Sequence, residues 1–503
     1  MDKNLRLLLL ILIIASFFRL YQITTIPPGL YPDEAMNGNN ALQALSTGDF
    51  KTFYPENNGR EGLFINIQAL FLKALNSPSQ VSAGEIWEGK PWVLRLPSAI
   101  FGILTVLGVY FLAKELFSTR VGLFSAFFLA ANFWHINFSR IGFRAIIAPL
   151  LLVWAVYFFL LALRKLKEQN AGQLPGSKIL CGLGFNTFVL ALFGGIVYGL
   201  GFYSYIAYRI TPLLFLLFIP FFGKEKGFWK AAGVFLLVAF FAALPLGIYF
   251  LQHPADFMGR TTQVSVFSSP SPLADLATNI VKTLGMFIFA GDWNWRHNLS
   301  GAPELFWPVG IVFLIGIVIG LKKLREFGVW NLELGILFSW FILAMFPVVI
   351  SNEGIPHALR SILMIPPAII LAGVGGAAVY EWLKIRNEYV TRAVVAFFAA
   401  FIVSGTYYSY FVSWAKSPDV QGAFAADYLK LGREINALPA STSKYVVVQA
   451  GGVAVNGIPM PAQTVMFVTD TFTTEKQQAK NIHYTLPGEE KNIPAGADIF
   501  YIR

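Results

Sequence analysis

The stretch AAGVFLLVAFFAALPLGIYF, residues 231–250, carries no charged side chain. As an α-helix it would extend about 30 Å, which matches the hydrocarbon core of a bilayer. Residues 96–113 and 145–163 form similar uncharged runs. The whole chain of 503 residues is 56% hydrophobic and only 13% charged, a composition that excludes an ordinary soluble protein. The sequence therefore predicts an all-α polytopic membrane protein.

We expect about eleven transmembrane helices, because runs of apolar residues recur along the chain at lengths that suit a bilayer. The first run could also be a cleaved signal peptide, but no small-residue cleavage pattern follows it, and a retained anchor is favoured. The expected spans are residues 7–23, 93–113, 121–139, 145–163, 181–203, 210–223, 230–250, 305–321, 332–350, 360–381 and 393–412.

The distribution of positive charge predicts the orientation of these helices. The net charge of +10 comes from small Lys and Arg clusters between apolar runs, so topology explains it better than a nucleic-acid partner does. With a cytoplasmic N-terminus, clusters such as Arg164 to Lys167 and Lys322 to Arg325 fall inside. We therefore expect a multi-pass protein of the inner (plasma) membrane, with the long loops 24–92 and 251–304 facing the periplasm or the outside.

Residues 413–503 are the one part of the chain whose sequence is typical of a soluble domain. Strand-like Tyr445 to Val448 and Val465 to Val468 are separated by Gly, Pro and Asn turn signals. We expect a transmembrane module over residues 1–412 and a small extracytoplasmic α/β domain over residues 413–503. The single cysteine, Cys181, excludes an internal disulfide and a site with several thiolate ligands.

The first outer loop contains adjacent acids, Asp33 and Glu34, at the start of a predicted helix that reaches about Leu45. Acids in a first turn are favoured by the helix dipole, so capping alone could explain them. Their position beside a bilayer favours a functional role, because charged groups there must be solvated or matched by cations. Both residues are candidate catalytic groups.

Arginines rather than lysines lie near the outer ends of the predicted spans. Such residues can be snorkelling anchors, but guanidinium groups also bind phosphate oxygens bidentately. We therefore predict a site for a phosphorylated lipid head group. The arginines considered are Arg140, Arg144, Arg209, Arg260, Arg296 and Arg360.

Two polar clusters near the outer span ends add His297 and His357 to the candidate phosphate-binding residues and Asp292 to the substrate-binding ones. The sequence lacks a His-x-x-x-His or similar ligand spacing, so no metal ligands are predicted. No cofactor is predicted either, although carboxylates could bind a divalent cation, so a requirement for such an ion stays undecided. Further candidate substrate contacts are Arg60 and Glu61, at a glycine-bounded turn, and Tyr208, which could instead belong to an interfacial aromatic belt.

An outer-face site has no cytoplasmic nucleotides available, and no Gly-rich phosphate loop follows a strand. A sugar linked to a lipid phosphate would meet this constraint, because arginines can stabilise the departing phosphate without a general acid. Asp33 would then take the proton from an acceptor hydroxyl in a single displacement with inversion, and Glu34 would position the acceptor or the base.

Three sequence elements resemble those of the GT-C glycosyltransferases. Within this superfamily the chain is most similar to the bacterial relatives of protein O-mannosyltransferase and lipid A aminoarabinose transferase (glycosyltransferase family 39-like). The three elements are Tyr31-Pro32-Asp33-Glu34-Ala35, the stretch from Trp92 to Ser98 with its Arg-Leu-Pro-Ser, and Arg140. The resemblance is strongest over residues 1–220. It implies a GT-C fold, a polyprenyl-phosphate-linked sugar donor and a catalytic aspartate at position 33, and it leaves a protein, lipid or cell-envelope glycan as the acceptor. Where family members carry a Lys-Pro-Pro-like turn, this chain has Gly59-Arg60-Glu61-Gly62.

Two alternatives from other classes remain. A transporter or flippase of a lipid-linked or anionic substrate would be favoured by charges within the spans and by broken helices in matching halves, and neither is clear in the sequence. A non-catalytic assembly or receptor protein would use the outer tail, and Asp33 would then be only a helix cap.

Overall fold

The computed structural model describes residues 2–76, 89–172, 179–180, 182–258, 265–327, 331–351 and 353–503. The predictions for Arg260 and Cys181 lie outside these residues. The chain divides into two compact units. Unit 1 comprises residues 1–19, 100–139 and 145–410, and unit 2 comprises residues 20–99, 140–144 and 411–503.

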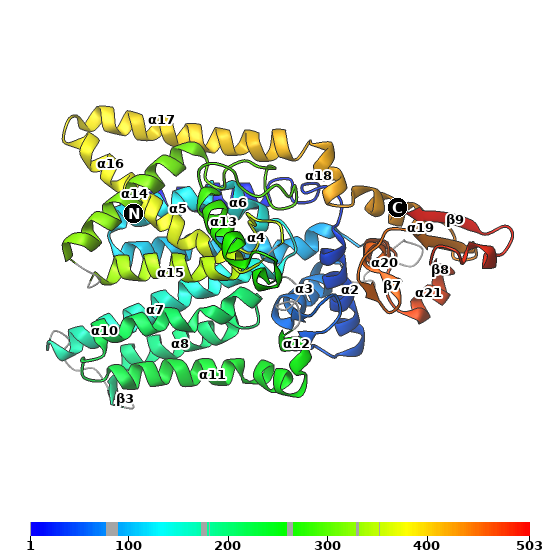
Figure 1. Cartoon of the computed structure of the whole chain (residues 1–503), viewed down its shortest axis with the longest axis horizontal. Coiled ribbons are helices and arrows are strands. Elements are labelled where there is room, and N and C mark those ends of the chain that lie inside the picture. Colours follow the sequence, from blue (N-terminus) through cyan, green and yellow to red (C-terminus); the bar gives the residue numbers. More distant parts are fainter. Residues whose placement is uncertain are drawn as a thin grey trace. The chain divides into compact units, whose positions relative to one another are not determined.

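Unit 1 is helical, and its long helices run lengthwise across Figure 1. The alternation of apolar runs with short charged or Gly-containing connections gives helices of membrane-spanning length. The helices are α1 (Lys3–Leu20), α5 (Thr119–Ala130), α6 (Phe133–Phe138), α7 (Ile147–Asn170), α8 (Phe185–Gly201), α9 (Pro212–Phe215), α10 (Ile219–Phe222), α11 (Phe228–Gln252), α12 (Pro254–Met258), α13 (Pro272–Gly285), α14 (Trp307–Phe327), α15 (Leu332–Val349), α16 (Ile365–Lys384) and α17 (Glu388–Tyr407), and α4 (Pro91–Leu116) begins in unit 2 and continues into unit 1.

Seven helices of the described chain are long and apolar enough to cross a membrane, which supports an integral membrane protein. They are Pro91–Leu116, Arg144–Asn170, Phe228–Gln252, Trp307–Glu326, Leu332–Val349, Ile362–Lys384 and Glu388–Trp414.

The other expected spans take shorter or more polar forms. The region 121–139 is broken between α5 and α6, where Asn132 caps α6 with its side chain. The region 210–223 is a series of short helical pieces, α8 has 17 residues, and α1 carries Lys3, Arg6 and Arg19. The number of spans therefore stays a prediction.

Glycines allow close packing of the helices in unit 1. A Cβ on Gly195 or Gly199 of α8 would lie 2.4 or 2.5 Å from a backbone oxygen of α11. A Cβ on Gly375 of α16 would lie 1.9 Å from the oxygen of Val312 in α14. Close backbone approach through small residues is typical of membrane helices. These glycines therefore allow the backbones of α8 and α11, and of α14 and α16, to approach closely.

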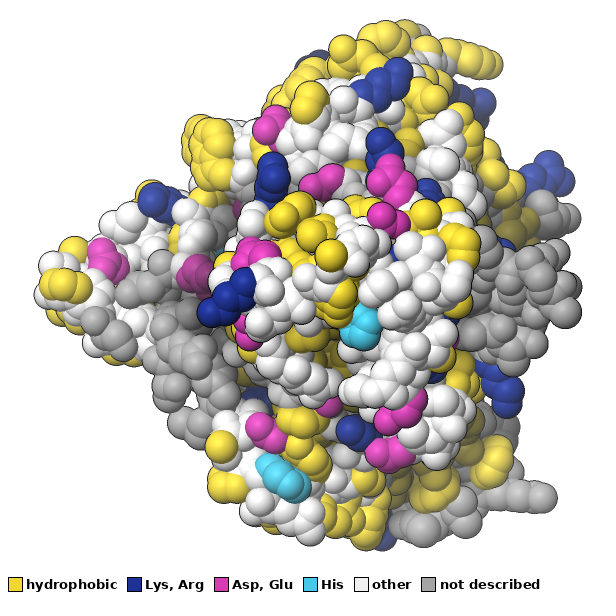
Figure 2. Space-filling model, turned by 90° about the vertical axis from the view of Figure 1, so that its right-hand side faces the viewer, with side chains coloured by type: hydrophobic (Ala, Val, Ile, Leu, Met, Phe, Trp, Pro, Cys, Tyr) yellow, Lys and Arg dark blue, Asp and Glu magenta, His cyan; other side chains and the backbone are white. Residues whose placement is uncertain are grey.

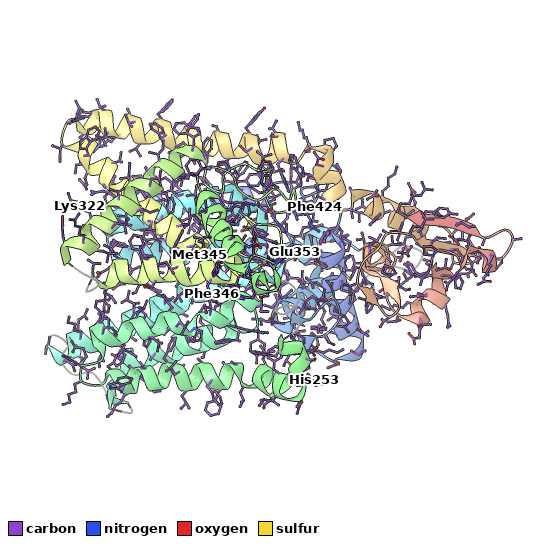
Figure 3. All side chains as sticks on the ribbon, in the orientation of Figure 1. His253, Lys322, Met345, Phe346, Glu353 and Phe424 are labelled. Atoms are coloured by element: carbon purple, nitrogen blue, oxygen red, sulfur yellow. The ribbon has the colours of Figure 1, made fainter. Side chains whose placement is uncertain are left out.

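The two ends of the unit 1 helices differ in the residues they carry. In Figure 3, Lys322 lies at one end of this bundle, whereas His253 and Glu353 lie toward the other end. The same separation is expected from the predicted topology, in which Lys322 is cytoplasmic and the loops bearing His253 and Glu353 are external. The side of the membrane that each end faces remains a prediction.

Unit 2 combines the first loop with the C-terminal segment. Its elements are α2 (Pro32–Thr47), β1 (Phe53–Tyr54), β2 (Arg60–Glu61), α3 (Gly62–Leu75), α18 (Pro418–Ala423), α19 (Ala426–Ala437), β5 (Lys444–Val448), β6 (Ala454–Val455), β7 (Ile458–Pro459), α20 (Gln463–Thr469), α21 (Thr474–Lys480), β8 (Ile482–Thr485) and β9 (Asp498–Ile502). A parallel sheet of order β8-β5-β9 forms its strand core, with Tyr445 paired to His483 and Ile499. The predicted strand at residues 465–468 is wrong, because Val465 to Val468 form the buried helix α20.

The C-terminal segment packs on α2 rather than standing apart from the loop. Asn39 donates to the Oε1 of Gln463 at 2.9 Å, and Thr464 donates to the backbone oxygen of Leu30 at 2.8 Å. A Cβ on Gly38 would come within 2.5 Å of the Phe467 ring. The first loop and residues 411–503 thus share one core, while the expectation of a separate domain at 413–503 stays untested. Figure 2 shows charged side chains of both signs scattered among hydrophobic and other side chains on the face that it draws.

Candidate active site

The acidic pair lies in the first turn of α2. Pro32 occupies the first helical position, where its missing N–H costs nothing, and Gly48 ends the helix at a φ of 75°. Asp33 and Glu34 follow Pro32, where the helix dipole favours negative charge. The sequence prediction of a helix beginning at these acids is confirmed.

Glu34 is fully buried and paired with Arg95 of α4. The guanidinium Nε lies 2.9 Å from Oε2, and Nη2 donates to Oε1 at 3.1 Å. Arg95 also donates to the backbone oxygens of Pro27 at 2.7 Å and Gly29 at 3.0 Å. Burial raises the pKa of Glu34, and the Arg95 charge opposes that rise. Arg95 therefore joins Glu34 of α2 to the loop at Pro27 and Gly29, and the Glu34 carboxylate is out of reach of solvent.

Asp33 has a different environment although it is adjacent in sequence. Its side chain is half-buried, and its Oδ1 accepts a hydrogen bond from the amide of Asn57 at 2.7 Å. Asn57 lies in the turn between β1 and β2 at a φ of 53°, a conformation that asparagine tolerates better than most residues. The carboxylate is thus oriented by an amide and forms no ion pair among the described residues.

Arg60 is a buried cation beside this carboxylate. Its guanidinium donates to the amide oxygens of Asn37 at 2.7 Å and Asn40 at 2.5 Å, and lies 3.9 Å from Glu56. Burial is the main cause that lowers the pKa of Arg60 to about 10, and the neighbouring Arg144 charge lowers it further. Asp33 acts in the opposite direction. Asp33, Arg60 and Arg144 are therefore close enough to interact electrostatically.

The structure also brings together Glu61 and Arg144, which the sequence assigns to substrate and phosphate binding. Arg144 donates from Nε to Oε2 of Glu61 at 2.7 Å, and Glu61 is buried whereas Arg144 is partly accessible. Arg140 is fully buried, donates to the backbone oxygen of Ile26 at 2.8 Å and stacks 5.2 Å from the Phe411 ring. These contacts favour a structural role for Arg140.

A second cluster of predicted residues lies in unit 1, in the loops that precede α14 and α16. The Nδ1 of His297 lies 2.9 Å from Oδ2 of Asp292, and the Nδ1 of His357 lies 3.8 Å from the same oxygen. Burial would raise the pKa of Asp292, but the hydrogen bond and charge of His297 outweigh it, so the pKa is lowered. Burial is the main cause that lowers the pKa of His297, and the hydrogen bond and charge of Asp292 oppose it.

Two predicted arginines accompany this second cluster. Arg360 donates to Oε2 of Glu353 at 2.7 Å and to the hydroxyl of Ser351, and Figure 3 places Glu353 in the loop after α15. The backbone oxygen of Arg296 accepts a hydrogen bond from Asn137 at 2.6 Å. Both arginines are close enough to His297 to lower its pKa.

Arg209 and Tyr208 lie in neither cluster. Arg209 donates to the backbone oxygen of Phe257 at 2.9 Å and stacks on the Phe257 ring at 4.5 Å. The Tyr208 ring is fully buried against Tyr198 and Gly201, so packing explains it better than stacking on a sugar.

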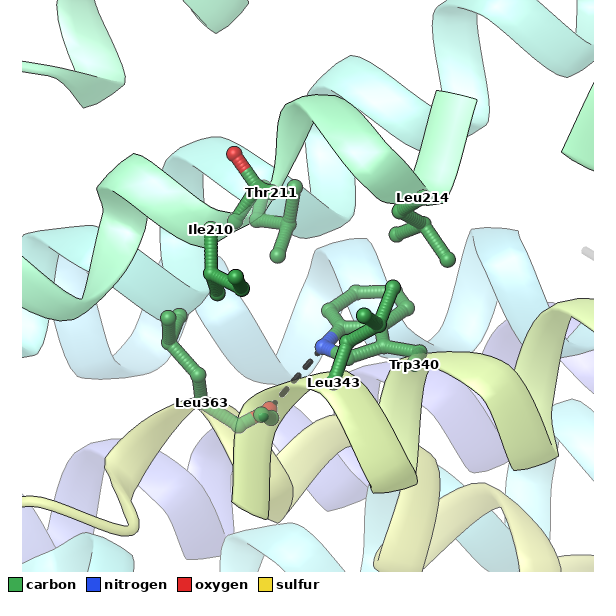
Figure 4. A pocket seen from close by; sticks show the side chains of 8 residues that line it. Ile210, Thr211, Leu214, Trp340, Leu343 and Leu363 are labelled. Atoms are coloured by element: carbon green, nitrogen blue, oxygen red, sulfur yellow. Dashed lines mark hydrogen bonds between the residues drawn. The ribbon is translucent and has the colours of Figure 1, made fainter. Parts of the chain in front are cut away.

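Unit 1 also contains an apolar pocket, and none of the predicted site residues lines it (Figure 4). Its one side-chain hydrogen bond drawn in Figure 4 runs from the Trp340 indole to the backbone oxygen of Leu363 at 2.9 Å. The lining residues are Leu152, Ile210, Thr211, Leu214, Trp340, Leu343, Ala344 and Leu363.

The sequence did not predict that Asn37, Asn40 and Asn57 would hold the charged groups of unit 2, or that Arg95 would neutralise Glu34. Asparagines in an amphipathic stretch carry no pattern that distinguishes a site from a turn. For a metal ion, Asp292, His297 and His357 are the one suitable group of three within the described parts of the chain.

Comparisons with known proteins identify the fold. A family model of dolichyl-phosphate-mannose-protein mannosyltransferases matches residues 83–193. No curated protein sequence matches the chain significantly. The oligosaccharyltransferase AglB from Archaeoglobus fulgidus, solved with an inhibitory peptide and a dolichol-phosphate, superposes with a TM-score of 0.57 at 15% identity over 93% of this chain and 63% of that one.

ArnT from Cupriavidus metallidurans, solved with undecaprenyl phosphate, superposes with a TM-score of 0.54 at 13% identity over 96% of this chain and 88% of that one. The chain thus spans less than two thirds of the archaeal enzyme it resembles and most of the bacterial one. These structural similarities show the GT-C fold, and the mannosyltransferase family model matches less than half of the chain.

Proposed function

We propose that this GT-C protein is an inverting glycosyltransferase that moves a sugar from a polyprenyl-phosphate donor to an acceptor hydroxyl at the outer face of the membrane. One observation carries the proposal. The half-buried Asp33 carboxylate is oriented by Asn57, which lies in the turn that leads to Arg60, and Arg144 donates to Gly59 and Glu61 on either side of Arg60. A base and two cations beside each other are the groups that this displacement requires.

Asp33 accepts the proton of the acceptor hydroxyl as that oxygen attacks the anomeric carbon. The bond from the anomeric carbon to the phosphate oxygen breaks at the same time, and the polyprenyl phosphate leaves as an anion. Arg144, which is partly accessible, meets the phosphate, and Arg60 adds positive charge from below the surface. Glu34 holds Arg95 and takes no direct part in the displacement.

The neighbours support the donor class. AglB was solved with a dolichol-phosphate and ArnT with undecaprenyl phosphate, which are both polyprenyl phosphates. The acceptor is a hydroxyl of a protein, a lipid or a cell-envelope glycan, and the site faces the periplasm or the outside of the inner (plasma) membrane. Arg140 and Tyr208 are assigned to packing in this proposal because their side chains are fully buried, and Arg209 is assigned to its contacts with Phe257.

The test is an assay with the purified full chain, radiolabelled polyprenyl-phosphate sugars and membrane extract as acceptor. We expect sugar transfer together with release of polyprenyl phosphate for at least one donor. If no donor released polyprenyl phosphate while vesicles containing the protein moved a lipid-linked sugar across the bilayer, the protein would be a flippase and the proposal would fail.

A further inference from the structure

The Asp292 cluster has a composition that the glycosyl transfer proposed above does not use. One carboxylate and two imidazoles, from loops more than fifty residues apart, place their ligand atoms within 4.8 Å of one another. Asp292 and His297 are buried, and the His357 side chain is 15% exposed, so the group lies just below the surface.

The Asp292 carboxylate is held in place before any ligand arrives. Its Oδ1 accepts the backbone N–H of Asn294 at 2.8 Å, and its Oδ2 accepts the backbone N–H of Ala358 at 2.9 Å. The second of these bonds ties the His357 loop to the Asp292 loop. The backbone N–H of Asp292 itself donates to Oε1 of the buried Glu304 at 3.0 Å. Such outer contacts orient metal ligands in known sites.

We propose that Asp292, His297 and His357 form a binding site for one divalent transition-metal ion such as Zn²⁺. Two imidazoles and one carboxylate are a common ligand set for such ions, and they leave a coordination position open for water or a ligand. With metal–ligand bonds of about 2.1 Å, donors around a tetrahedral ion lie roughly 3.4 Å apart. The distances of 2.9 and 3.8 Å from Oδ2 to the two imidazole nitrogens lie on either side of that value.

The charges around the cluster favour a cation over a directly bound phosphate. The Asp292 carboxylate, whose pKa is lowered despite its burial by its hydrogen bond with His297 and by the nearby histidine charges, would repel an anion. Arg296 and Arg360 oppose a cation, but Arg360 is paired with Glu353 at 2.7 Å. The ion would displace the proton that His297 shares with Asp292. This assignment differs from the sequence prediction, in which the histidines contact the phosphate.

The test uses the untagged full chain in detergent, because a polyhistidine tag would itself bind the metal. The protein is stripped with a chelator, dialysed against Zn²⁺ or Co²⁺, and then examined by elemental analysis and by visible absorption of the cobalt form. We expect one ion per chain with the absorption bands of a site containing nitrogen and oxygen ligands. The readout needs no catalytic activity. The proposed metal site is therefore tested independently of the proposed transferase reaction.

The variants separate this cluster from adventitious binding. Asp292→Asn and His357→Ala should lose the bound ion and the cobalt bands, whereas His253→Ala and His483→Ala, in histidines outside the cluster, should keep both. Because Asp292 is buried and its replacement could impair folding, the more accessible His357 provides the second test, with thermal unfolding as the check. Equal metal content in the wild type and in a folded His357→Ala variant would overturn the proposal.

Discussion

Two buried carboxylates, Glu34 in unit 2 and Asp292 in unit 1, differ in what their partners leave available. Arg95 donates to Glu34, and the same guanidinium donates to two backbone oxygens. Both charged groups are therefore already engaged within the protein. Asp292 instead accepts from a histidine and two backbone N–H groups, and a second histidine lies nearby. Burial of a charge therefore does not by itself mark a functional site. A functional site is indicated when the partners of the buried charge can also bind a ligand.

The same contrast separates Glu34 from Asp33, its neighbour. Asp33 is held by one amide and is half-buried, so its carboxylate can still accept a proton.

The largest effect is expected for Asp33→Asn. If Asp33 is the general base, the variant should lose about 10²- to 10⁴-fold in transfer rate, because its amide cannot accept the hydroxyl proton. Transfer of radiolabelled sugar at saturating donor measures this loss. Asp49→Asn, an exposed aspartate after the end of α2, is the matched control and should remain active. An Asp33→Asn protein as fast as the wild type would remove Asp33 from the chemistry.

Arg95→Met should reduce stability rather than chemistry. Removing the guanidinium leaves Glu34 buried without its partner, which typically costs about 3–5 kcal/mol. Thermal unfolding in detergent should show a clear fall in Tm. Lys430→Met removes an exposed ion pair with Glu434 and should change Tm little. An unaltered Tm for Arg95→Met would mean that the pair does not hold unit 2 together.

Arg144→Ala tests the phosphate contact. Loss of a charged hydrogen bond to the donor phosphate should weaken donor binding by roughly 1.5–3 kcal/mol. The expected result is a higher KM for the polyprenyl-phosphate sugar. Arg392→Ala breaks an exposed pair with Glu388 and serves as the control. If donor affinity is the same in both variants, Arg144 belongs with the arginines whose contacts are internal.

Asn57→Gly should have the smallest effect. Glycine accepts the left-handed backbone of this turn, so the substitution removes the amide without strain. Loss of the hydrogen bond that orients Asp33 should slow transfer by about fivefold, equivalent to roughly 1 kcal/mol. Asn58→Gly, the next residue and also at positive φ, is the control. Equal rates in the two variants would show that Asn57 does not position the base.

Long apolar runs predicted helices of membrane-spanning length, of which the described chain contains seven, and the Pro-Asp-Glu turn predicted the helix that begins at Pro32. The GT-C fold was expected from the family resemblance and not from local patterns. They did not predict the break near Asn132, because a span reads as continuous when its polar residue is only a helix cap. They also misassigned Val465 to Val468, where a run of buried apolar residues suits a strand or a helix equally well.

The candidate site was predictable only in part. The sequence placed Asp33, Arg60, Glu61 and Arg144 among the candidates, and unit 2 brings them together. It gave Asp33 the role of base and Glu34 that of positioning the acceptor or the base, but it did not predict that Glu34 would pair with Arg95, sixty-one positions further along the chain. It also gave no metal ligands, since His297 and His357 come from different loops and no local spacing reveals them.

The stereochemistry of transfer tests the role of Asp33 most directly, because loss of activity alone does not separate a base from a nucleophile. NMR of the product made by the wild-type protein would give the anomeric configuration of the transferred sugar relative to that in the polyprenyl-phosphate donor. A single displacement with Asp33 as the base predicts inversion. Retention of configuration would contradict this account, because it would require a covalent glycosyl-enzyme intermediate.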